Sequence, residues 1–115
     1  MSKKIFIVYG HHNTKKSFNA TIRDTFIDEA KKYGHEIDLI NLHEEKKLHF
    51  FDGTPPNEQV LDYRKRLEKS DVMFMISPCY NLRASAILEN WIDLVLAPKW
   101  FFAFKRVVGN WGYPV

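Results

Sequence analysis

The chain alternates short apolar runs with longer segments of helical period. The apolar runs cover residues 4–9, 36–42 and 71–77. Run 4–9 (KIFIVY) is almost continuously apolar, which is typical of a strand buried on both faces. Run 36–42 (EIDLINL) alternates apolar with polar residues, which predicts a more exposed edge strand. Run 71–77 (DVMFMIS) is strongly apolar and predicts a central strand.

The segments that follow these runs repeat their apolar residues at helical spacing, so we expect helices over 17–33, 57–69 and 84–97 and loops over 43–57 and 78–83. Strands that alternate with helices predict an α/β domain with a parallel, right-handedly wound sheet. An antiparallel α+β domain is the alternative. The apolar face of the first helix is predicted to comprise Phe18, Ile22, Phe26, Ile27, Ala30 and Tyr33.

Composition limits the class of protein. The 115 residues are 45% hydrophobic, which indicates one ordinary folded domain and excludes a disordered chain. No apolar run approaches 18 residues, so we expect no membrane insertion, and the first apolar stretch is too short for a secretory signal. We therefore expect a cytoplasmic protein. The single cysteine, Cys79, excludes a disulfide framework, and the five histidines lack ligand spacing, so no metal site is expected.

Charge argues against a nucleic-acid partner. The formal net charge is +3, and the residues Lys99, Lys105 and Arg106 account for the whole excess. A nucleic-acid-binding domain usually carries a larger basic stripe.

The first loop of interest covers residues 10–16 and joins the first strand to the first helix. Ligands of open parallel sheets lie beyond the carboxyl ends of the strands, and a helix start offers unpaired N–H groups. The loop and the helix start supply cationic and polar side chains, namely His11, His12, Lys15, Lys16, Ser17 and Asn19. Together they suit a phosphate or pyrophosphate, although neither GxGxxG nor GxxxxGK[ST] is present. The alternative for Ser17 is a plain helix N-cap.

The second loop, residues 78–83, follows the third run. Tyr80 and Leu82 offer flat apolar surface and Asn81 offers hydrogen bonds, so a planar heterocycle could lie here with its phosphate end over the first loop. The alternative is a connecting loop whose Tyr80 packs on the domain surface. Cys79 is interpreted as a buried small apolar residue rather than a nucleophile, since no paired base accompanies it.

Three blocks of the sequence, in order, resemble the flavodoxin-like NAD(P)H:quinone oxidoreductases, including the modulator-of-drug-activity type. KIFIVYGHHNTKKSFNA resembles their opening strand and its Ser-Phe-Asn helix start. ISPCYNLRASAILENWIDLVL resembles their second block, and FFAFKRVVGNWGYPV their Gly-Phe-Ala-Phe and Gly-Trp-Gly-Tyr-Pro stretch. The blocks span nearly the whole chain, so the resemblance implies a flavodoxin-like, flavin-binding domain over residues 1–115.

The resemblance also implies a cofactor and its contacts. FAD or FMN would be bound non-covalently, and the first loop with the FFAF stretch favours FAD. The flavin would take hydride from NAD(P)H and pass it to a quinone or a similar acceptor. By family match, the phosphate would be held by His11, Ser17, Phe18 and Asn19, the isoalloxazine would lie along Pro78, Cys79, Tyr80, Asn81 and Leu82, and the substrate side, often across a dimer, would be lined by Trp100, Phe102 and Phe104.

The chain also departs from this family. The family sheet has five strands in the order 2-1-3-4-5, and the sequence ends at Val115, where strand 4 would begin. We therefore expect a truncated sheet, 2-1-3, with strand 71–77 at an edge. An edge of this kind invites a partner strand, so we expect a homo-oligomer or a fragment of a longer product.

Several residues of the family pattern are replaced in the first two blocks. His12 stands for a proline, Asn81 for an aromatic residue, Ser85 for a second proline and Glu89 for a lysine. These replacements keep two alternatives open, a non-catalytic ancillary or regulatory subunit and an inactive truncated product.

Overall fold

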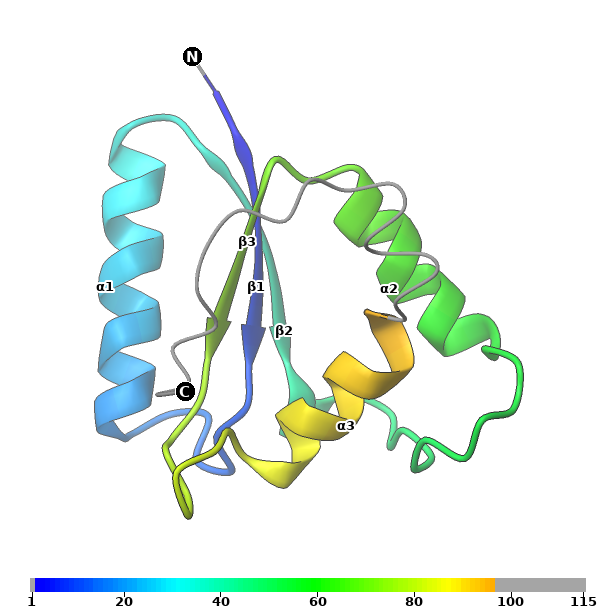
Figure 1. Cartoon of the computed structure of the whole chain (residues 1–115). Helices are drawn as coiled ribbons and strands as arrows, with labels where there is room; N and C mark the ends of the chain where they lie inside the picture. The colour runs from blue at the N-terminus through cyan, green and yellow to red at the C-terminus, as the bar shows by residue number, and fades with distance from the viewer. Residues whose placement is uncertain (1, 97–115) are drawn as a thin grey trace.

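The computed structural model describes residues 2–96, which form one three-stranded parallel sheet (Figure 1). The strands are β1 (Lys4–Tyr9), β2 (Glu36–Asn41) and β3 (Val72–Ile76), in the order β2-β1-β3. β1 pairs in parallel with both neighbours. The predicted α/β class and the 2-1-3 order are confirmed, and the antiparallel alternative is wrong.

Helices cover both faces of this sheet and make it the middle of three layers. The helix α1 (Phe18–Lys32) lies on one face, and α2 (Glu58–Glu68) and α3 (Ala86–Val95) lie on the other (Figure 1). A short 3₁₀ turn, η1 (Leu42–Glu44), follows β2, so the strand ends one residue before its predicted end. None of the helices between residues 2 and 96 is long and apolar enough to cross a membrane.

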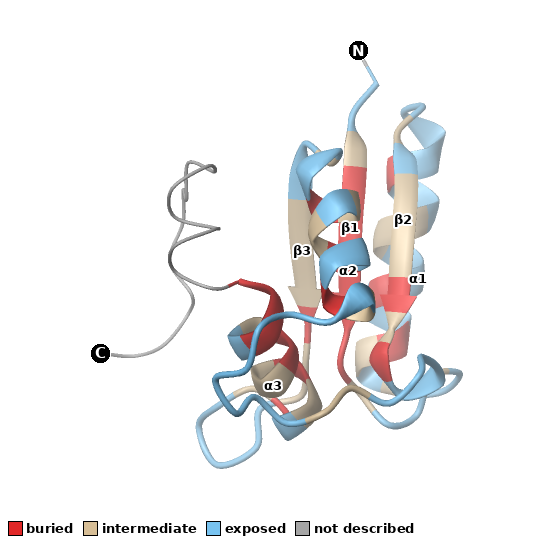
Figure 2. Ribbon diagram, turned by 90° about the vertical axis from the view of Figure 1, so that its right-hand side faces the viewer, coloured by how far each residue is buried: buried red, intermediate tan, exposed pale blue. Residues whose placement is uncertain are grey.

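The core forms around β1, whose residues from Ile5 onward are buried (Figure 2). Side chains of a strand alternate between its faces. Phe6 therefore packs with Trp91 of α3, at 6.0 Å between ring centroids, whereas Ile7 and Tyr9 belong to the cluster beneath α1. A strand that is apolar on both faces is thus placed between two layers of helix, as its sequence predicts.

The inward face of α1 differs from the predicted one. Phe18 and Tyr33 are 79% and 75% exposed, so their predicted burial is wrong. The buried residues are Ala20, Arg23 and Ala30. These positions follow the helical repeat, so the direction of the face is set by small residues and one arginine rather than by the large aromatic side chains.

The two outer strands differ in exposure. β2 is mostly half-buried, and its predicted edge position is confirmed. Within the described part of the chain β3 pairs with β1 alone, and Val72 is 44% exposed, so β3 is the second edge rather than a central strand. The three aromatic residues of the predicted substrate side, Trp100, Phe102 and Phe104, lie outside the described residues.

Candidate functional site

The two predicted ligand loops meet at the carboxyl ends of β1 and β3. The backbone N–H of Gly10 donates to the carbonyl of Ile76 at 2.8 Å, and the Ser85 hydroxyl donates to the carbonyl of Gly10 at 2.6 Å. A Cβ atom at Gly10 would lie 2.9 Å from Ser85 Oγ and 3.0 Å from Leu88 Cβ. Only glycine therefore allows the start of the first loop to approach α3 so closely.

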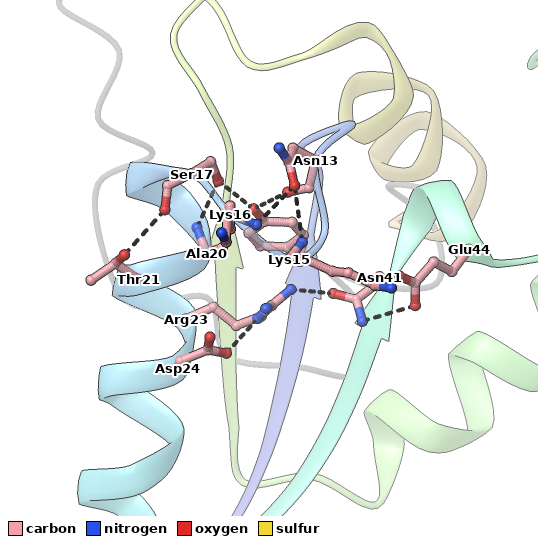
Figure 3. A network of polar contacts seen from close by, with 11 residues as sticks. Asn13, Lys15, Lys16, Ser17, Ala20, Thr21, Arg23, Asp24, Asn41 and Glu44 are labelled. Carbon is pink, nitrogen blue, oxygen red and sulfur yellow. Dashed lines mark hydrogen bonds and ion pairs between the residues drawn. The ribbon is translucent and has the colours of Figure 1, made fainter.

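The first loop is held by hydrogen bonds from its own side chains. Asn13 Oδ1 accepts from the backbone N–H groups of Lys15, at 3.1 Å, and Lys16, at 2.8 Å (Figure 3). The Tyr9 hydroxyl donates to the carbonyl of Asn13 at 2.8 Å and lies 2.9 Å from Ser17 Oγ. The amides of Lys15 and Lys16 are therefore already occupied, and their side chains remain exposed.

The start of α1 supplies the remaining donors. Ser17 caps the helix, since its Oγ accepts from the N–H of Ala20 at 2.9 Å, which confirms the N-cap interpretation. Among the described residues no acceptor takes up the N–H groups of Phe18 and Asn19. Free amides at a helix start, with the positive end of the helix dipole, favour an anion.

Three histidines, which we call the histidine cluster, lie beside this loop: His11, His12 and His43. The rings of His11 and His12 stack at 4.3 Å, and those of His12 and His43 meet edge-on at 6.5 Å. Burial, followed by the charges of His12 and His11, lowers the pKa of His43 below its ordinary value. Across residues 2–96 no group of three or more His, Cys, Asp or Glu side chains is arranged to hold a metal ion.

The second loop ends in a tight turn. Tyr80 and Arg83 exchange two backbone hydrogen bonds, at 2.9 and 3.1 Å, across Asn81 and Leu82, whose φ angles are +53° and +63°. This turn presents Tyr80 (44% exposed) and Leu82 (79% exposed) to solvent as flat and apolar surface. Cys79 is also exposed, so its predicted burial is wrong.

The predicted residues therefore fall into two groups at one edge of the sheet. The first loop and helix start carry His11, Ser17, Phe18 and Asn19, and the second loop carries Pro78, Cys79, Tyr80, Asn81 and Leu82. The strands β1 and β3, which precede these loops, are paired neighbours. The arrangement places a helix start with free amides and an apolar turn at the same edge of the sheet.

Sequence reasoning missed three residues whose side chains contact the loops or the strand ends at this edge. They are Tyr9, which the sequence predicts only as part of a strand, Ser85, which departs from the family pattern, and Arg23. Arg23 is 6% exposed, and its guanidinium lies 4.5 Å from the centroid of the Tyr9 ring. The available signal was the spacing of Arg23 from Ala20 and Ala30, which places the three residues on the same face of α1.

Comparisons with known proteins agree with this architecture. A family model described as a flavodoxin-like fold matches residues 3–113. The chain is 27% identical over 125 residues to human ribosyldihydronicotinamide dehydrogenase (quinone), covering 87% of this chain and 54% of that protein. It is 26% identical over 129 residues to FMN-dependent NADH:quinone oxidoreductase 4 of Burkholderia lata, covering 97% and 62%.

Among solved structures, the NAD(P)H:quinone oxidoreductase from Methanothermobacter marburgensis superposes with a TM-score of 0.71 at 22% identity, covering 83% of this chain and 53% of that one. At this identity the likeness concerns the fold. The chain spans about half the length of the human relative that it matches.

Proposed function

The chain belongs to the flavodoxin-like family, and we therefore propose that it is the flavin-binding portion of an NAD(P)H:quinone oxidoreductase. The observation that carries this proposal is the hydrogen bonding of Gly10 to Ile76 and Ser85, the residues on either side of the second loop, which holds both loops at the same edge of the sheet. The proposal is supported by the names of the human and Burkholderia lata relatives, both of which include quinone as a substrate.

The phosphate end of the flavin is assigned to the helix start and the ring to the turn. The donors for the phosphate are the free amides of Phe18 and Asn19, with the exposed Lys15 and Lys16 as counter-charges. The ring would lie along residues 78–82, where Tyr80 can stack on it.

The proposed cofactor is FMN rather than the FAD that the sequence favoured. Two free amides at one helix start suit one phosphate, and the amides of Lys15 and Lys16 that a pyrophosphate would also need are occupied by Asn13. The name of the Burkholderia lata relative specifies FMN and NADH. When bound, the flavin would supply two-electron chemistry, accepting hydride from NADH and passing it to a quinone. The chain's own part is to bind and orient it.

A titration with FMN and FAD tests this proposal. The purified protein is followed by flavin fluorescence and visible absorbance, and Tyr80→Ala is compared with Tyr33→Ala, which removes an equally aromatic exposed side chain at the far end of α1. Stacking of an aromatic side chain on a base contributes about 1–3 kcal/mol, so Tyr80→Ala should weaken FMN binding by about 5- to 150-fold. Tyr33→Ala should leave binding unchanged.

Two outcomes would overturn the flavin proposal. One is no saturable binding of either flavin, and the other is an equal loss of affinity in both tyrosine variants. Reduction of a quinone by NADH then separates an enzyme from the alternative of a non-catalytic ancillary subunit, which would bind flavin or a partner without turnover. That the protein is cytoplasmic stays a prediction.

We further propose that a second copy of this chain covers the outer edge of β3. Support comes from the apolar sequence of this strand, from the 44% exposure of Val72 and from its single pairing within residues 2–96. An unpaired strand edge is a template for another strand. Light scattering should report a dimer or larger assembly, and Val72→Lys should shift it toward monomer. A well-folded wild-type monomer at high concentration would contradict the proposal.

A further inference from the structure

One buried hydroxyl joins the middle of the first loop to the start of α1. Tyr9 is the last residue of β1 and is fully buried. Its hydroxyl donates to the carbonyl of Asn13 at 2.8 Å and lies 2.9 Å from Ser17 Oγ. Both partners belong to the loop and its helix cap, and neither belongs to the core that surrounds the ring. The phenol therefore acts on the shape of the loop.

The ring of Tyr9 is in turn held from the side by Arg23. The guanidinium lies over the ring, 4.5 Å from its centroid. Its Nη1 donates to Asn41 Oδ1 at 3.0 Å and its Nε donates to Asp24 Oδ1 at 2.9 Å (Figure 3). Asn41 is the last residue of β2. Arg23 thus ties α1 to the carboxyl ends of both β1 and β2, directly beneath the loop.

We propose that Tyr9, braced by Arg23, is the positioning residue that presets the loop for the anionic end of the ligand. This inference rests on the proposed flavin function. The loop contains exposed lysines and no large apolar anchor of its own. Gly10 fixes its start and Asn13 holds the amides of Lys15 and Lys16, whereas the Tyr9 hydroxyl ties the middle of the loop to the core before the ligand arrives. A loop ordered in advance costs less to bind, and the benefit appears in affinity rather than in chemistry.

The chain offers a matched control for this role. Tyr63 of α2 is also buried, at 1% exposure, and its hydroxyl donates to Glu45 Oε1 at 2.8 Å on the opposite face of the sheet. Burial, followed by this hydrogen bond, raises the pKa of Tyr63, so its hydroxyl stays protonated at neutral pH. Tyr9→Phe and Tyr63→Phe therefore remove the same atom from equally buried sites, but only one of them touches the loop.

The experiment compares these two variants by three measurements: urea unfolding, FMN titration and the rate of tryptic cleavage after Lys15 and Lys16. Both variants should lose similar stability in urea. Only Tyr9→Phe should weaken FMN, by about three- to tenfold, the range expected for one lost hydrogen bond. Only Tyr9→Phe should also be cleaved faster in the loop, because the hydroxyl that binds the Asn13 carbonyl is gone.

The outcomes separate this inference from the proposed function. Wild-type affinity and wild-type cleavage in Tyr9→Phe would overturn the positioning role, as would an equal affinity loss in Tyr63→Phe. If the wild-type protein binds no flavin, the proposed function fails, whereas the cleavage rates still decide whether Tyr9 sets the loop. Arg23→Lys keeps the positive charge but loses the planar group that lies over the Tyr9 ring, so it should also be cleaved faster in the loop. Cleavage of this variant at the wild-type rate would show that Arg23 does not hold Tyr9 in place.

Discussion

Replacing Gly10 by alanine tests whether the contact between the two loops holds this edge of the sheet together. The added methyl group would lie 2.9 Å from Ser85 Oγ and 3.0 Å from Leu88 Cβ, whereas carbon atoms in contact normally stand about 3.5–4.0 Å apart. The serine hydroxyl can rotate away, but it then loses its 2.6 Å hydrogen bond to the Gly10 carbonyl. Leu88 Cβ cannot rotate, so α3 or the loop must move.

The expected cost combines two terms. Overpacking of a well-packed site costs about 1–3 kcal/mol, and the lost hydrogen bond adds about 0.5–1.5 kcal/mol. For a domain of this size each kcal/mol lowers the melting temperature by about 4–8 °C. Gly10→Ala should therefore lower the free energy of unfolding by about 1.5–4.5 kcal/mol, as measured by urea denaturation and thermal melting.

A double variant isolates the contact that causes this loss. In Gly10→Ala/Ser85→Ala the hydroxyl is absent, so one of the two close contacts is relieved and the hydrogen bond is lost only once. The double variant should lose less stability than the sum of the two single variants. Unchanged stability in Gly10→Ala, or strict additivity in the double variant, would refute the reasoning.

Three further predictions concern other parts of the molecule. Asp38 accepts two hydrogen bonds from Arg66, at 3.0 and 2.6 Å, so Asp38→Ala should lower the free energy of unfolding in urea by about 1.5–3 kcal/mol; a loss below about 0.5 kcal/mol would contradict this. Burial and the neighbouring histidines lower the pKa of His43 below 6.5, so the unfolded chain binds more protons. The contribution of His43 to stability should be complete above pH 6.5 and be lost as the pH falls from 6.5 through its lowered pKa. In thermal melts, the melting temperature of His43→Gln should decrease less over this pH range than that of the wild type. The Asn90 amide donates to the carbonyl of His49 and accepts from the N–H of Phe51, both at 2.9 Å. Asn90→Ala should therefore make the loop around residues 49–51 the fastest site of proteolysis, and a digestion pattern identical to that of the wild type would contradict this.

The sequence carried enough information for the elements of the fold because their signals are local. The five apolar residues after Lys4 specify a strand buried on both faces, and Ser17 and Asn57 mark helix starts through their caps. The segment that forms α3 contains no proline and repeats its apolar residues at helical spacing, so its sequence predicts this helix. The positions of the two loops follow from parallel winding, because carboxyl ends of paired strands meet at one edge.

The supporting contacts could not be read in the same way because they join residues far apart in sequence. Ser85 and Gly10 are separated by 75 positions, and nothing near Ser85 indicates that its hydroxyl is buried. Arg23 is charged, and charged residues are rarely buried unless they are paired, so its position in the sequence of α1 does not by itself predict burial. Its burial depends on Tyr9 and Asn41, which only the folded sheet brings beside it.

The turn between Tyr80 and Arg83 has a consequence for how this molecule would evolve. Left-handed backbone at a residue other than glycine costs about 1–2 kcal/mol, and Leu82 combines that conformation with an apolar side chain that is 79% exposed. A glycine would remove both disadvantages, so selection for heat resistance alone would favour glycine over leucine at this position. Under the proposed function, in which the flavin ring lies along residues 78–82, the same glycine would remove an apolar contact to the ring, so stability and flavin affinity would require different residues at position 82.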